Sequence, residues 1–101
     1  MARFDTLDMA SGGLALVLEP HASWEQFTDY SEDWISRLNA TVLVPPITSF
    51  DECLVEVRIG SGDFWITYDD FQAAIHLEAK ELQYNSTILA LQQQLRQGSQ
   101  S

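Results

Sequence analysis

Hydrophobic and polar residues alternate most regularly between Cys53 and Lys80, in the run CLVEVRIGSGDFWITYDDFQAAIHLEAK. Three alternating segments are separated there by a GSGD break at 60–63 and a DD break at 69–70, so that the third segment begins at Phe71. Alternation places successive side chains on opposite faces of a strand, and Gly, Ser and Asp tolerate the backbone angles of tight turns. The pattern predicts a three-stranded antiparallel meander against which the rest of the chain packs.

An amphipathic helix is predicted between Ser23 and Asn39. Ser23 is a favoured N-cap, Gln26 three residues later completes a capping-box pattern, and Asn39 can end the helix. An apolar stripe recurs at helical spacing and is expected to face the core: Trp24, Phe27, Tyr30, Trp34, Ile35 and Leu38. The opposite face carries the acidic residues Glu25, Asp29, Glu32 and Asp33.

Three further segments complete the predicted elements. LALVLE at 14–19 is a compact apolar run that ends at Pro20, which suits a central strand buried on both faces. TVLV at 41–44 predicts a strand that the prolines at 45–46 stop. Asn85 or Ser86 can cap a last helix over 87–97. Its inward stripe would be Ile88, Leu91 and Leu95.

The element order β-α-β-β-β-β-α predicts an α+β fold, in which two helices cover one face of a mostly antiparallel sheet of about five strands. A chain of 101 residues has the size of a single domain. Residues 1–13 are a poorly defined N-terminal segment, in which Phe4, Leu7 and Met9 suit a weak edge strand. Residues 97–101 are expected to fray.

The charge balance narrows the class of partner. Fifteen acidic residues against five basic ones give a formal net charge of −10, while 46% of the residues are hydrophobic. A field of this sign repels nucleic acids and anionic membranes, and it attracts a basic protein. The alternative reading is that the acidity only keeps a small globular protein in solution.

The number of cysteines and the length of the apolar runs indicate the cellular compartment of the protein. Cys53 is the single cysteine, so an internal disulfide is excluded and a reducing compartment fits. The apolar run at 14–18 is too short for a signal sequence or a membrane span. We therefore expect a cytoplasmic protein.

Candidate catalytic and metal-ligating residues are few. Cys53 with His76 or His21 as its base would suit a nucleophile, but a lone cysteine on an apolar strand face is far more often a buried small hydrophobe. His76 and Glu78 share a strand face and could form part of a metal site. Two candidate ligands without a third at a recognisable spacing are, however, more often a surface polar pair. The acid pairs at 51–52 and 69–70 are in exposed turns, where catalysis is rare. We expect no catalytic residues, no metal and no cofactor.

The acidic residues themselves are the strongest candidate for a site. Seven of them occur between Arg3 and Arg37 without an intervening base, and a second group gathers at the predicted sheet turns. Trp65 would be an exposed interface anchor if the helices cover the opposite face of its strand, and a core residue otherwise. The predicted partner-binding residues are Glu25, Asp29, Glu32, Asp33, Asp63, Trp65, Asp69 and Asp70.

Two resemblances add expectations. The run DECLVEVRIGSGDFWITYDDFQAAIHL at 51–77, with the helix opening WEQF at 24–27, resembles a family of small bacterial proteins of unknown function. The size, acidity and predicted layout also resemble cytoplasmic immunity proteins of bacterial toxin–immunity pairs. That likeness implies a binding protein that occludes the active groove of a basic toxin domain, such as a nuclease. The alternative is a small accessory or homodimeric protein without catalytic activity.

Overall fold

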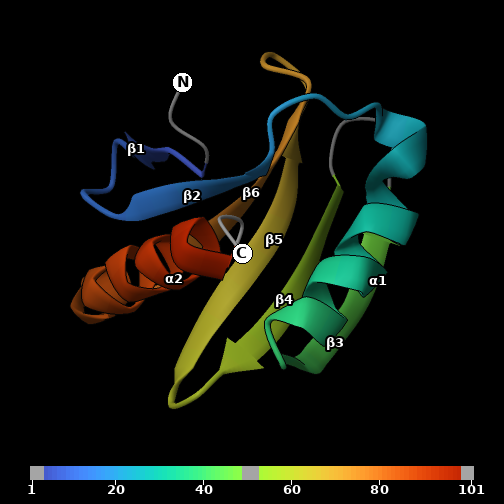
Figure 1. Ribbon diagram of the computed structural model, residues 1–101. Helices are drawn as coiled ribbons and strands as arrows, with labels where there is room; N and C mark the ends of the chain where they lie inside the picture. The colour runs from blue at the N-terminus through green and yellow to red at the C-terminus, as the bar shows by residue number, and fades with distance from the viewer. Residues whose placement is uncertain (1–3, 49–52, 99–101) are drawn as a thin grey trace.

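The structure is a computed structural model that describes residues 4–48 and 53–98. Within these residues six strands form a single sheet of order β1-β2-β6-β5-β4-β3, and every neighbouring pair is antiparallel (Figure 1). The strands are β1 (Thr6–Asp8), β2 (Leu14–Glu19), β3 (Thr41–Thr48), β4 (Cys53–Ile59), β5 (Gly62–Asp69) and β6 (Ala74–Ala79). The helices are α1 (Phe27–Arg37) and α2 (Asn85–Gly98), each preceded by a short 3-10 turn, η1 (Trp24–Gln26) and η2 (Leu82–Tyr84).

The α+β prediction is confirmed, with one strand more than expected. The additional strand is β1, which pairs with β2 through Thr6 and Leu16 and forms one edge of the sheet. β2 itself lies between β1 and β6, so it is second from this edge and not central.

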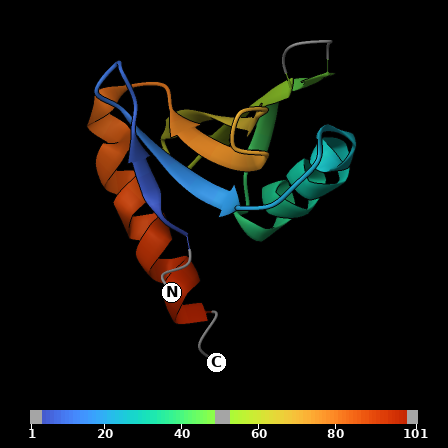
Figure 2. The same ribbon diagram turned by 90° about the horizontal axis from the view of Figure 1, so that it is seen from above.

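Both helices lie on the same face of the sheet, and the core fills the space beneath them. Figures 1 and 2 show α1 over β3 and β4, and α2 beside β2 and β6. Alternate residues of the meander point into this core and are fully buried: Val55, Val57, Phe64, Ile66, Ile75 and Leu77. The opposite face of the sheet, which we call the open face, therefore carries the other alternate residues of β4, β5 and β6.

The meander follows the predicted pattern closely at its first turn. β4 and β5 pair in register from Leu54 with Thr67 to Ile59 with Gly62, which leaves Gly60 and Ser61 as a two-residue turn. Gly60 has a φ of 62°, a conformation that glycine adopts without steric cost.

The prediction that Pro45-Pro46 stops the strand at 41–44 is wrong. β3 runs through both prolines to Thr48. It is the outermost strand of the sheet, so an absent N–H breaks no ladder on its outer side. The pairing with β4 also shifts between Val42 and Val44 and again between Val44 and Ile47, and such irregularities accommodate proline.

The first helix begins and ends as expected, with one change. The Ser23 N–H donates to Gln26 Oε1 at 2.9 Å, and Asn39 terminates the helix with a left-handed φ of 54°. The first turn, however, is 3-10, with about three residues per turn instead of 3.6. This difference rotates Trp24 away from the buried stripe and leaves its side chain 46% exposed.

The last helix begins at Asn85, two residues earlier than the predicted range, and reaches Gly98. The Asn85 side chain joins α2 to the loop between β1 and β2: Oδ1 accepts the Leu14 N–H at 3.0 Å, and Nδ2 donates to the Gly12 carbonyl at 3.2 Å. Ile88 is buried, while Leu91 and Leu95 pack partly buried against the core, as the stripe predicted.

Candidate protein-binding surface

The four acids predicted on the first helix lie together and face solvent. Glu25 is in η1, and Asp29, Glu32 and Asp33 are in α1; all four are exposed. Asp33 pairs with Arg37 at 3.9 Å, and among the described residues the other three have no ion-pair partner. The long separation and high exposure of this pair make it weak, so the helix presents an almost uncompensated negative surface.

A hollow of about 300 Å³ lies along this helix. It is lined by Gln26, Asp29, Tyr30 and Asp33, which stand at the i, i+3, i+4 and i+7 positions of one helical stripe. The hollow therefore offers two carboxylates, a side-chain amide and an aromatic ring. Such a set can accept a guanidinium or ammonium group through charge-assisted hydrogen bonds and contact with the ring.

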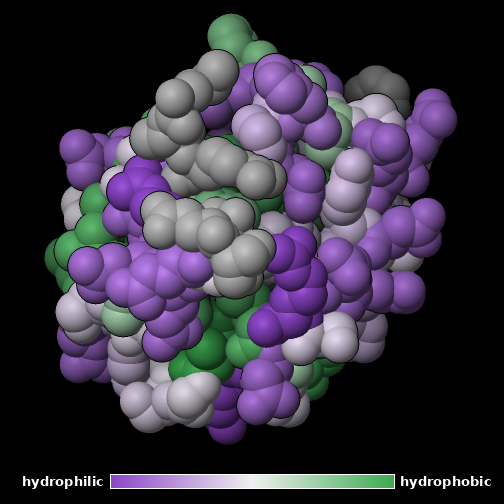
Figure 3. Space-filling model, in the orientation of Figure 1, coloured by the Kyte–Doolittle hydropathy of each residue, from purple (hydrophilic) through white to green (hydrophobic). Residues whose placement is uncertain are grey.

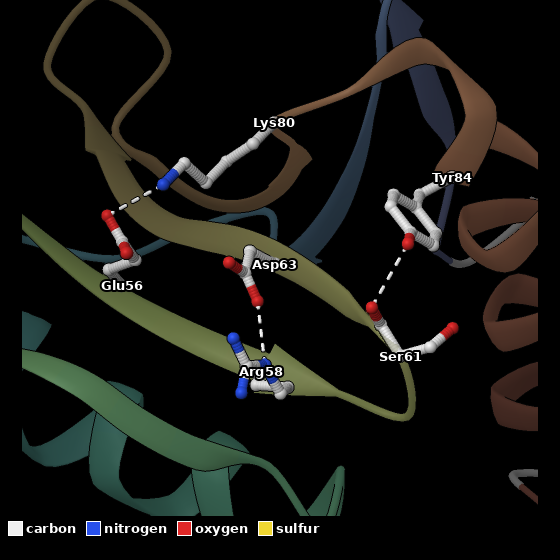
Figure 4. A network of polar contacts seen from close by, with 6 residues as sticks. All are labelled: Glu56, Arg58, Ser61, Asp63, Lys80 and Tyr84. Atoms are coloured by element: carbon white, nitrogen blue, oxygen red, sulfur yellow. Dashed lines mark hydrogen bonds and ion pairs between the residues drawn. The ribbon is translucent and has the colours of Figure 1, made fainter.

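The other predicted acids are not part of this surface. Asp63 is near the first residue of β5 and pairs with Arg58, whose Nε donates to Asp63 Oδ1 at 2.9 Å (Figure 4). This hydrogen bond raises the pKa of Arg58 above its ordinary value. Asp69 is the last residue of the same strand, and Asp70 follows it. The structure thus groups the four helix acids but places Asp63 and Asp69 at opposite ends of β5.

Trp65 lies on the open face, as it should when the helices cover Phe64 and Ile66. It is nevertheless only partly exposed. The Lys80 ammonium stands 5.2 Å from the centroid of the Trp65 ring. The same ammonium forms an ion pair with Glu56 at 2.9 Å, which Figure 4 shows. Lys80 and Glu56 therefore occupy part of the surface that an interface anchor would need.

His76 and Glu78 do not form the exposed polar pair expected from the sequence. His76 is buried, with 4% of its surface exposed, because β6 is an inner strand and Thr67 and Val17 flank His76 on both sides. Glu78 Oε2 accepts the Thr67 hydroxyl at 2.8 Å.

The buried imidazole is electrostatically unusual. Burial lowers the pKa of His76 below its ordinary value, and the nearby charges of Asp69 and Glu78 oppose this effect. Its Nε2 is buried and has no hydrogen-bond partner among the described residues. Because that atom is inaccessible, Nε2 is no candidate for binding an external ligand.

The remaining chemical candidates are separate from one another. Cys53 is buried on the helix-covered face, and burial raises the pKa of its thiol, which disfavours the nucleophilic thiolate. His21 is exposed in the segment before η1. Within residues 4–48 and 53–98, no three His, Cys, Asp or Glu side chains are grouped so that they could hold a metal ion. Neither described helix has the length and apolar character needed to cross a bilayer.

Several exposed apolar side chains were missed by the sequence analysis. Phe71 is 100% exposed, because β6 begins only at Ala74 and the residue belongs to the turn before it. Its position directly after Asp69-Asp70 was a signal that the turn extends further. The outermost strand β3 also exposes three large apolar residues: Val42, Val44 and Ile47.

No protein-family model, no curated protein and no solved structure matches this chain. The resemblances drawn from the sequence thus gain no support from these comparisons.

Proposed function

We propose that this chain is an acidic, non-catalytic, cytoplasmic binding protein whose partner is a basic protein. In its most concrete form it is an immunity protein, which neutralises a basic bacterial toxin domain such as a nuclease by occluding the active groove. The acids of η1 and α1 pair with cationic residues that would otherwise hold the substrate of the toxin. No step of covalent chemistry is required for this kind of inhibition.

The observation that carries the proposal is the hollow on α1. Asp29 and Asp33 line it together with the Tyr30 ring, and both carboxylates are exposed. A lysine or arginine side chain of the partner fits the chemistry of this hollow, because two carboxylates and a ring face satisfy one cation. The surrounding charge, −10 over the whole chain, would accelerate the encounter with a basic protein.

Affinity capture from a native lysate tests the proposal. Capture is done at about 0.05 M and about 0.5 M salt, since the Debye length falls from about 14 Å to about 4 Å over this range. We expect a basic protein to be retained at low salt and released at high salt. Recovery of no basic protein, or retention that is indifferent to salt, would contradict the proposal.

A helix-neutral variant is the matched control for this capture. It carries the four isosteric changes Glu25→Gln, Asp29→Asn, Glu32→Gln and Asp33→Asn, which remove four charges from exposed positions and leave the core unchanged. We expect it to retain the fold by circular dichroism and to lose the captured protein.

The edge strand β3 favours a second candidate, a homodimer or accessory subunit. Val42, Val44 and Ile47 expose apolar surface on the outermost strand, and open strand edges can pair with another chain. Native mass spectrometry and light scattering separate the two candidates: a stable homodimer that retains no other protein would favour the second.

A further inference from the structure

The turn between β5 and β6 presents a single aromatic side chain to solvent. Phe71 is 100% exposed, and a hydrophobic projection stands at the top of the molecule in Figure 3, where Figure 1 places this turn. A phenylalanine of this kind contributes nothing to the core. When a partner covers it, it removes roughly 150–250 Å² of apolar surface from water.

The turn holds the backbone at Phe71 in a defined place. Asp69 Oδ1 accepts the Phe71 N–H at 2.9 Å and the Gln72 N–H at 3.4 Å. Ala73 adopts a φ of 52°, and its carbonyl accepts the Ala22 N–H at 2.8 Å. The turn is thus fixed both internally and to the segment that leads into η1. A turn whose backbone is held in place before binding loses less backbone conformational entropy when it binds.

The surroundings of Phe71 indicate the chemistry of the partner. The two segments joined by the Ala22–Ala73 hydrogen bond lie at the same end of the sheet (Figure 1). Residues 20–25 and 69–74 include three acids, Glu25, Asp69 and Asp70, and no lysine or arginine. Trp24, in the first of these segments, adds a second aromatic side chain that is 46% exposed.

We infer that Phe71 is the aromatic anchor of this protein, and that it enters an apolar pocket rimmed by lysine or arginine residues on a basic protein partner. The inference is based on the proposed function and moves its anchor from Trp65, which Lys80 partly covers, to the β5–β6 turn. A second copy of the chain fits this end poorly, because it would bring the same acids face to face. Glu25 links this end to the helix acids, so the binding surface extends from the turn along α1.

Selection from a random-peptide library tests the anchor. The wild-type protein is the bait, and a synthetic peptide of the consensus sequence is then the probe for affinity measurements. We expect the consensus to combine basic residues with aromatic or aliphatic ones. Phe71→Ser should weaken binding of this peptide by at least about 30-fold, as expected for an interface hot spot. Circular dichroism verifies that this exposed substitution leaves the fold intact.

Leu89→Ser is the matched control, because it removes an exposed apolar side chain from α2, away from the turn. It should leave the affinity within about twofold, as expected for a residue outside the interface. Basic peptides could bind Phe71→Ser as tightly as wild type and bind the helix-neutral variant more weakly. This result would overturn the role of Phe71 as the anchor and would still support the proposed function. A consensus without basic residues contradicts both. Self-association that Phe71→Ser abolishes would assign the anchor to a second copy and also overturn the inference.

Discussion

Replacing Asn85 with alanine should destabilise the fold, because one side chain joins α2 to the loop between β1 and β2. The two hydrogen bonds to Leu14 and Gly12 contribute about 0.5–1.5 kcal/mol each, or about 1–3 kcal/mol together. Alanine has a higher helix propensity than asparagine, which offsets about 0.5 kcal/mol of this loss. The net loss should be about 0.5–2.5 kcal/mol, equivalent to a fall in Tm of roughly 2–20 °C for a domain of this size.

Urea unfolding followed by circular dichroism measures this loss as a change in midpoint at constant slope. Asn85→Asp is the informative control, since it keeps the acceptor for the Leu14 N–H and removes the donor to Gly12. The stability of Asn85→Asp should lie between those of wild type and Asn85→Ala. Hydrogen exchange of the Leu14 amide should accelerate in Asn85→Ala. An unchanged unfolding midpoint in Asn85→Ala would refute the reasoning.

Three further predictions concern the core and the open face. Gly62→Ala should cost about 1–3 kcal/mol in urea unfolding, since its Cβ would lie 2.7 Å from the Tyr84 ring; full stability would contradict this packing. His76 has a lowered folded pKa, so the unfolded state binds its proton first and stability should fall as pH drops below about 6.5. His76→Gln should reduce this dependence of the free energy of unfolding on pH. An unaltered pH dependence would show that other groups cause it. Lys80→Ala should expose more of the Trp65 ring and increase acrylamide quenching, whereas unchanged quenching would show that Lys80 does not cover it.

The sequence was sufficient for the parts of the fold that local patterns determine. Strict alternation determined the faces of β4 and β5, and Gly60 supplied the positive φ that the intervening turn requires. Ser23 and Asn39 marked the ends of the first helical segment for similar local reasons.

The parts that the sequence did not predict depend on tertiary neighbours. The prolines of β3 are tolerated only because that strand is outermost, and sheet order is not visible in a single strand. Trp65 is partly covered because Lys80, which follows β6, reaches across it to Glu56 on β4. The helix acids could be predicted as a group from their spacing, but the hollow beside Tyr30 required the folded chain.

In the proposed function, the acids of η1 and α1 attract a basic protein. The most direct measurement is the association rate constant of the captured basic protein with wild type and with the helix-neutral variant, at a series of salt concentrations. For wild type we predict a rate that falls steeply as salt rises, by tenfold or more, while the variant associates slowly and with little dependence on salt. Equal rates for the two proteins, with equal salt dependence, would contradict the account.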